Sequence, residues 1–232
     1  MKRQLLTGVL AASTLTLAAF SQATPAHALS FSGGTVNLTA NDVGSTFQVN
    51  FDGNVNGNNV PGLSAQALFT LTSYATNQAN FTVNLINTTT VPITSRISRL
   101  GFNTNPGVNV DASSATGVFT DVITGSFPNK FGDVEVCFVP SSRGTCGGGP
   151  GGVTTTGNFT TNLVFTGSLT NGLSLSDFGV RYQSINGGGF DDASGTGRGT
   201  PIPTPALLPA VLGMGAAVLR KKKQEAKVAE KV

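Results

Sequence analysis

Apolar and polar residues alternate in short runs through the middle of the chain. Phe47, Val49 and Phe51 alternate with polar neighbours, and related runs of period two recur further along. These further runs lie at residues 65–72, 81–86, 134–138, 163–165 and 180–182. A period of two places one face of a segment against a core, which is typical of a half-buried β-strand. Because Asn-Gly, Asp-Gly and Asn-Pro-Gly turn sequences separate the runs, the pattern predicts about eight to ten antiparallel strands in a two-sheet sandwich or jelly roll.

The alternating pattern sets the expected boundaries of this all-β domain. It covers residues 29–185, which we expect to be the β-sandwich domain. Residues 186–204 are rich in Gly, Ser, Thr and Pro, a composition typical of flexible linkers. The sequence therefore predicts a flexible tether here, leading into a separate C-terminal segment at residues 203–232.

The first 28 residues have the three parts of a secretory signal peptide. Lys2 and Arg3 form the charged start, and a mostly apolar run extends to Phe20. Ala26 and Ala28 form a small-x-small cleavage site. We expect export through the Sec pathway and removal of residues 1–28 by signal peptidase. The alternative is an N-terminal membrane anchor, which the Ala-x-Ala site and the polar stretch before it disfavour.

The C-terminal segment also has three parts. It begins with a four-residue motif, Pro203, Thr204, Pro205 and Ala206. An apolar run of residues 206–219 follows, and then a basic block of Arg220, Lys221, Lys222 and Lys223. The run is short for a membrane span, which takes about 20 apolar residues. The basic block would hold its end in the cytoplasm and leave the middle domain outside. An ordinary C-terminal membrane anchor is the alternative.

This order of motif, short apolar run and basic block resembles the PTPA variant of the PEP-CTERM sorting segment, which is typical of cyanobacterial surface proteins. The more common form has Glu where this chain has Thr204. The resemblance implies recognition by an exosortase-like membrane protease, a transient stay in the inner membrane, and transfer to the cell surface or the medium. It also implies an association with exopolysaccharide.

The middle domain resembles one PEP-CTERM subgroup, the cistern family. The similar stretches are residues 51–57, 61–65, 129–138, the glycines that follow Cys146, and residues 180–184. That family brings no enzymatic activity with it. The resemblance therefore implies a structural or binding role for the mature chain.

Charge is distributed unevenly along the chain. The net charge is +3, but residues 1–28 carry +2, residues 205–232 carry +4, and the middle carries −3. Binding to a phosphate backbone needs Lys and Arg gathered on one face. Since the linear sequence of the middle domain shows no basic cluster, we expect no nucleic-acid partner.

Cys137 and Cys146 are the only two cysteines. In an exported chain such a pair most simply forms a disulfide, which would pin the loop of residues 139–145 as a flap. Two thiols without a histidine cannot complete a structural zinc site, so we expect no metal and no cofactor. Residues 52–57 match half of a calcium loop, but Leu63 stands where the loop needs its bidentate acid, which favours a plain hairpin turn.

The candidates for catalysis are weak. The single histidine, His27, leaves with the signal peptide, so no histidine base remains for a nucleophile. Asp133 and Glu135 share one strand face, and we expect both to be solvated surface residues. The sequence therefore predicts a non-enzymatic surface protein with no catalytic residues. A carbohydrate-binding module is the alternative, with Tyr74 and Tyr182 as stacking residues, and a plain membrane-anchored surface protein is the third hypothesis.

Overall fold

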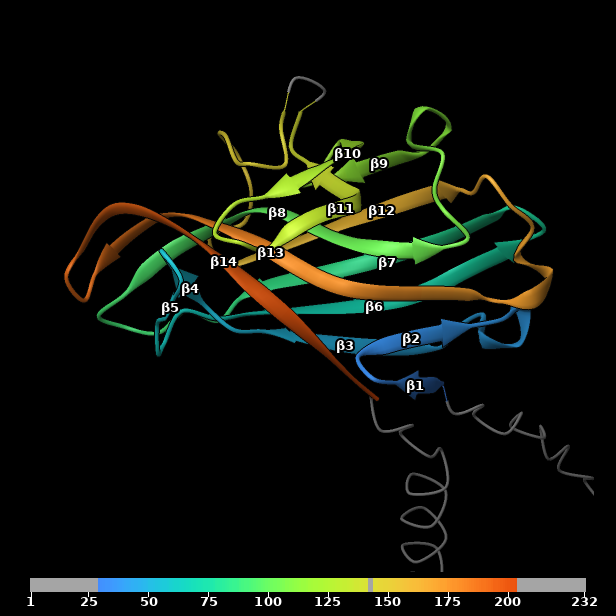
Figure 1. Cartoon of the computed structure of the whole chain (residues 1–232), viewed down its shortest axis with the longest axis horizontal. Helices are drawn as coiled ribbons and strands as arrows, with labels where there is room; N and C mark the ends of the chain where they lie inside the picture. Colours follow the sequence, from blue (N-terminus) through green and yellow to red (C-terminus); the bar gives the residue numbers. More distant parts are fainter. Residues whose placement is uncertain (1–28, 142–143, 204–232) are drawn as a thin grey trace, which may run out of the picture. The chain divides into compact units, whose positions relative to one another are not determined.

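The computed structural model describes residues 29–141 and 144–203, which form an antiparallel all-β domain (Figure 1). The strands are β1 (Ser30–Ser32), β2 (Thr35–Leu38), β3 (Thr46–Phe51), β4 (Asn54–Val55), β5 (Asn58–Asn59), β6 (Ala65–Ala75), β7 (Gln78–Asn87), β8 (Thr94–Asn105), β9 (Ser114–Gly117), β10 (Asp121–Phe127), β11 (Gly132–Val139), β12 (Thr156–Val164), β13 (Leu173–Gly187) and β14 (Phe190–Pro203). Three single 3-10 turns join them: η1 (Ala40–Asp42), η2 (Val110–Ala112) and η3 (Leu169–Asn171). The described residues contain no α-helix.

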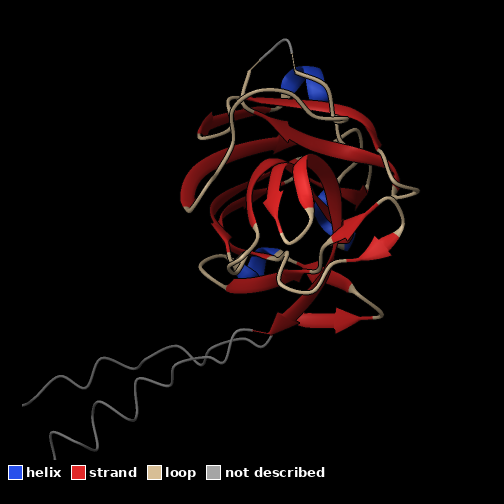
Figure 2. Cartoon of the chain, turned by 90° about the vertical axis from the view of Figure 1, so that its left-hand side faces the viewer, coloured by secondary structure: helices blue, strands red, loops and turns tan. Residues whose placement is uncertain are grey.

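One continuous sheet makes up the domain, with strand order β10-β11-β8-β13-β14-β3-β6-β7-β12-β9. β1, β2, β4 and β5 pair at its margins. The sheet curls around its own core until it is a nearly closed barrel, as the end-on view in Figure 2 shows. The predicted antiparallel all-β class is confirmed. The two expected sheets are joined into one because β14 pairs with β13 along residues 190–198 and with β3 along residues 199–203.

Phenylalanine rings fill the interior of the curled sheet. Phe47 stacks on Phe69 with ring centroids 4.9 Å apart, and Phe178 meets the edge of Phe69 at 5.8 Å. The line of rings continues through Phe102, Phe138, Phe159 and Phe119. All of these rings are buried, and edge-to-face pairs add stabilisation beyond their buried area. The alternating apolar residues of the sequence thus supply the main core of the domain.

The predicted tether is wrong for residues 186–203. Gly187 ends β13, a turn follows, and β14 then runs from Phe190 to Pro203. A Cβ on Gly197 would lie 2.2 Å from the Asp52 carbonyl oxygen, and one on Gly195 would lie 2.5 Å from the Asn54 carbonyl oxygen. These glycines therefore serve the close approach of two strands and do not confer flexibility. The β domain extends to Pro203 and not to residue 185.

The predicted signal peptide and most of the predicted sorting segment lie outside the described residues. These include Ala26, Ala28, Thr204, Pro205, Ala206 and the basic block at residues 220–223. Within the described part of the chain, the first residue of the predicted motif, Pro203, is the last residue of β14. No helix among the described residues is long and apolar enough to cross a membrane.

Residues 52–57 form a hairpin turn, as expected in preference to a calcium loop. β4 and β5 pair on either side of Asn56 and Gly57, and both of these residues have positive φ, at 53° and 87°. The Asn54 side chain accepts a hydrogen bond from the Gly57 amide at 2.8 Å. Two consecutive left-handed residues define the tight turn that Asn-Gly sequences favour.

Candidate functional site

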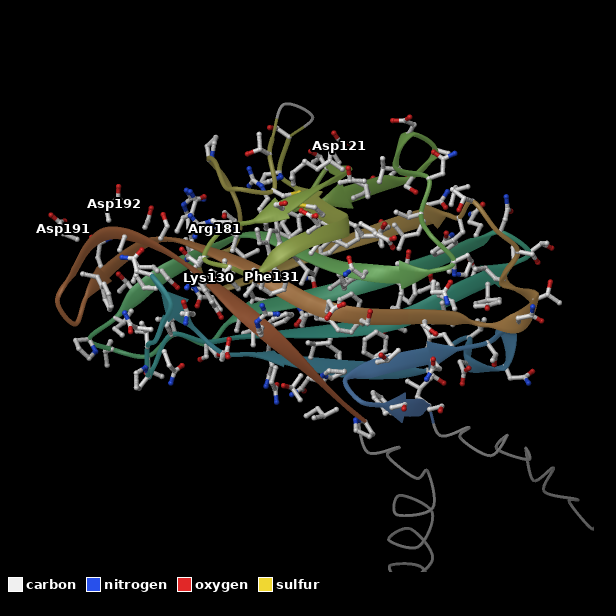
Figure 3. The ribbon with its side chains drawn as sticks, in the orientation of Figure 1. Asp121, Lys130, Phe131, Arg181, Asp191 and Asp192 are labelled. Carbon is white, nitrogen blue, oxygen red and sulfur yellow. A yellow bond between two sulfur atoms is a disulfide. The ribbon has the colours of Figure 1, made fainter. Side chains whose placement is uncertain are left out.

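Asp133 and Glu135, the two acidic residues considered for catalysis, are both exposed on β11. Glu135 accepts hydrogen bonds from the amide and hydroxyl of Thr104, at 2.8 and 3.0 Å, and Asp133 accepts one from Ser126. Asp191 and Asp192 lie at the tip of the β13–β14 hairpin, well away from Asp121 (Figure 3). Within the described chain no three His, Cys, Asp or Glu residues gather into a possible metal site. Among the described residues, Asp133 and Glu135 are therefore surface carboxylates and not a pair held across a cleft.

The two tyrosines are not exposed stacking platforms. Tyr182 is fully buried, and its hydroxyl donates to the Asp52 carbonyl oxygen at 3.0 Å. Burial, with a smaller contribution from the Asp52 charge, raises the pKa of Tyr182 well above its usual value. The half-buried Tyr74 donates to the Leu169 carbonyl oxygen at 2.8 Å, and burial also raises its pKa. Tyr182 is sealed in the core and Tyr74 packs partly buried against it, so neither ring is presented as an open stacking surface.

The predicted disulfide is confirmed. Cys137 on β11 is bonded to Cys146. Cys146 lies near the start of a glycine-rich segment, residues 144–152, which overlaps the end of the predicted loop at residues 139–145. We call this segment of residues 144–152 the glycine-rich flap. Both cysteines belong to a second, smaller apolar cluster with Phe127, Val134 and Val139. The disulfide thus fixes one end of the flap to the sheet.

Beneath this flap lies a group of basic side chains that sequence reasoning missed, which we call the arginine cluster: Arg96, Arg99 and Arg181. Arg99 on β8 is directly opposite Arg181 on β13, and Arg96 is opposite Gln183. Arg99 is 1% exposed and Arg181 is 8% exposed, while Arg96 is half-buried. Residues separated by more than 80 positions therefore meet because β8 and β13 are neighbours in the sheet.

The arginine cluster donates to the main chain of the flap. Arg99 Nε donates to the Thr145 carbonyl oxygen at 2.6 Å, and Arg181 Nε donates to the Gly147 carbonyl oxygen at 2.9 Å. Arg96 donates to the carbonyl oxygens of Gly149 and Gly151. The arginine cluster therefore holds the flap along most of its length.

Two glycines of the flap are required because side chains from the sheet approach them too closely for a Cβ atom. A Cβ on Gly149 would lie 2.8 Å from Arg99 Nη2, and one on Gly148 would lie 2.7 Å from the Gln183 amide. Both glycines also have positive φ, at 147° and 130°. The glycine run that resembles a flexible linker in the sequence instead brings carbonyl groups within reach of buried guanidinium groups.

In the described chain, no carboxylate balances the positive charges of the arginine cluster. Burial, together with the like charges of Arg96 and Arg181, lowers the pKa of Arg99 to about 10. Burial also lowers the pKa of Arg181. In the described chain the guanidinium groups bond to carbonyl and amide oxygens, with no carboxylate among their partners. Like charges directly opposite on neighbouring strands are destabilising, so this arrangement has a cost that the flap carbonyls offset only in part.

A second candidate feature is a polar groove of about 360 Å³ beside η3. The Asn37, Asn105 and Asn171 amides line it, together with Ser168 and Ser174. The side chains of Asn105 and Asn171 are exposed and have no hydrogen-bond partner within the described chain. No charged residue lines this groove, so its chemistry suits a neutral ligand rich in hydroxyl groups.

Comparisons with family models, with curated proteins and with solved structures find no match to this chain.

Proposed function

We propose that the protein is a non-enzymatic cell-surface or extracellular-matrix protein, built on the antiparallel β domain and associated with exopolysaccharide. The protein is first exported through the Sec pathway and then held transiently in the inner membrane. An exosortase-like enzyme then processes its C-terminus. The observation that carries the proposal is the ordered pair of terminal segments: the Ala26-x-Ala28 site, and the PTPA motif with its apolar run and basic block.

The boundaries of the β domain support this itinerary. β1 begins at Ser30, directly after the expected cleavage at Ala28, and β14 ends at Pro203, where the motif begins. Removal of both terminal segments would thus leave the paired strands intact. The disulfide between Cys137 and Cys146 suits an oxidising compartment outside the cytoplasm.

The amide-lined groove favours a second function, that of a carbohydrate-binding module. Free Asn105 and Asn171 amides can donate to and accept from sugar hydroxyls. Saturable binding of a neutral glycan that the double variant Asn105→Ala/Asn171→Ala loses would support this function. Asn59→Ala, an exposed amide on β5, is the matched control. Equal binding by the double variant and the control would reject the groove.

The proposed itinerary is tested by the intact mass of the protein from its native host, measured in cell, membrane and medium fractions. A surface or medium species that starts at Leu29 and ends near Pro205 is the expected result. A full-length C-terminus that runs to Val232 and remains in the membrane would overturn the processing step. That result would instead support a plain C-terminally membrane-anchored surface protein.

A further inference from the structure

We propose that the arginine cluster is a binding site for a single carboxylate or sulfate group, of the kind that acidic polysaccharides carry. The site consists of Arg96, Arg99 and Arg181 with the glycine-rich flap above them. Naming a polysaccharide as the carrier of the anion rests on the proposed function. The proposed affinity of the site for the anion itself does not depend on that function.

The first argument is the concentration of positive charge in an acidic domain. Residues 29–204 carry a net charge of −3, with six basic side chains. Three of the six converge in the arginine cluster, and two of those are directly opposite each other on β8 and β13. A purely structural anchor for the flap would not need three like charges, because neutral amides such as that of Gln183 can bond to main-chain groups at far lower cost.

The second argument is the set of donors left over. A guanidinium has five N–H groups. Arg99 uses its Nε and Nη1 toward Thr145 and Ser98, and Arg181 uses its Nε and Nη1 toward Gly147 and Gly195. Within the described chain the Nη2 groups of Arg99 and Arg181 and the Nε of Arg96 donate to no acceptor. Anions with several oxygens match such remaining donors better than a neutral ligand does.

The third argument is access. Arg99 is 1% exposed and Arg181 is 8% exposed, so the flap covers both guanidinium groups, whereas Arg96 is half-buried. A Cβ on Gly149 would meet only the Arg99 guanidinium within 4 Å, apart from adjoining flap residues. A Cβ on Gly144 would also lie 3.3 Å from Arg99 Nη2, so two flap residues without side chains face this group. Since Arg96 is the half-buried member of the cluster, we expect a ligand to reach the cluster past this side chain.

The test is calorimetric titration of the full chain, purified with its disulfide intact, at constant ionic strength. The probes are trigalacturonate, which presents carboxylates, sodium sulfate as a free inorganic anion, and dextran as a neutral glycan. Arg96→Gln is the informative variant because Arg96 is half-buried, and circular dichroism checks that it remains folded. Arg198→Gln is the matched control, since Arg198 is exposed and its guanidinium lies over the Phe131 ring.

We expect saturable binding of trigalacturonate that Arg96→Gln weakens about tenfold or more, since a charge-assisted hydrogen bond is lost. Arg198→Gln should bind as the native protein does, and dextran should not bind. Equal affinity in Arg96→Gln and native protein, or no saturable binding of either anion, would overturn the proposal. If sulfate binds and trigalacturonate does not, an acidic polysaccharide is not the molecule that carries the anion to this site. None of these results depends on the C-terminal processing tested above.

Discussion

Arg99 and Arg181 are directly opposite each other on β8 and β13, with both guanidinium groups buried and no carboxylate partner in the described chain. Their hydrogen bonds go to main-chain carbonyl oxygens instead. Arg99 donates to those of Thr145 and Ser98, and Arg181 donates to those of Gly147 and Gly195. Carbonyl groups carry only a partial negative charge, so the positive charges remain unneutralised. The geometry of the guanidinium fork, and not charge alone, is therefore what holds the flap.

Arg99→Lys should destabilise the domain by about 1–3 kcal/mol, although it keeps the positive charge. A single ammonium group cannot take the places of both Nε and Nη1, so either the Thr145 or the Ser98 carbonyl oxygen loses its partner. Urea unfolding of the full chain measures the change. Arg198→Lys, at an exposed position, is the control and should lose less stability than Arg99→Lys, because water can replace its hydrogen bonds to the Lys130 and Phe131 carbonyl oxygens. Equal free energies of unfolding for the native protein and Arg99→Lys would mean that the fork geometry of Arg99 does not stabilise the domain.

Gly197→Ala should destabilise the domain by about 3 kcal/mol, since the new Cβ would lie 2.2 Å from the Asp52 carbonyl oxygen and 2.9 Å from the Tyr182 ring. Gly107→Ala is the matched control, because its Cβ would make only ordinary contacts, the nearest at 3.7 Å to Thr166. Thermal unfolding of both variants distinguishes a strand from a tether. If residues 190–203 were flexible, the two substitutions would have the same small effect.

The sequence predicts the β-strands well because alternation is a local property, readable within runs such as Phe47 to Phe51. It predicts the disulfide for a similar reason, since Cys137 and Cys146 are close in the chain and a predicted signal peptide would direct them to an oxidising compartment. The glycines of β14 mislead because composition does not reveal whether a missing side chain gives freedom or close approach. The need for Gly197 becomes visible only when the Asp52 carbonyl oxygen is placed beside it.

The arginine cluster could not be predicted from the sequence for a different reason. Arg96 and Arg99 are near each other in the chain, but Arg181 meets them only through the pairing of β8 with β13. Strand order is a non-local property that alternation does not encode. A linear count of charges therefore finds no basic cluster, although the folded chain has one.

Removing the disulfide should lower the free energy of unfolding by about 2.7 kcal/mol, the chain-entropy estimate for a ten-residue loop. The variant is Cys137→Ala/Cys146→Ala, which keeps both positions apolar inside their cluster. Hydrogen–deuterium exchange of residues 144–152 should rise, while the arginine bonds still retain part of the flap. Reductant should reproduce the effect in the native protein and have no effect on the double variant. Unchanged exchange in the flap would show that the arginine cluster alone holds it.

Tyr182 should make the domain less stable as the pH rises above about 10. Burial raises the pKa of Tyr182 well above its usual value of 10.0 in the folded chain, whereas the unfolded chain exposes an ordinary phenol. The phenol contribution to stability is therefore fully present below pH 10, and is lost progressively as the pH rises from there toward the folded-state pKa. Arg99 acts with the opposite sign, because its folded-state pKa of about 10 lies below the usual value for an arginine.

Comparison of the native protein with Tyr182→Phe isolates the tyrosine contribution from that of Arg99. At pH 8 the variant should lose about 1 kcal/mol, since the hydrogen bond to the Asp52 carbonyl oxygen is gone. Between pH 8 and pH 11 the native protein should lose more stability than the variant, so the two curves of unfolding free energy converge. Tyr74→Phe, at the less buried tyrosine, should leave most of the pH dependence in place. Parallel curves for native protein and Tyr182→Phe would mean that Tyr182 ionises in the folded chain, and that its ring is not sealed in the core as the structure has it.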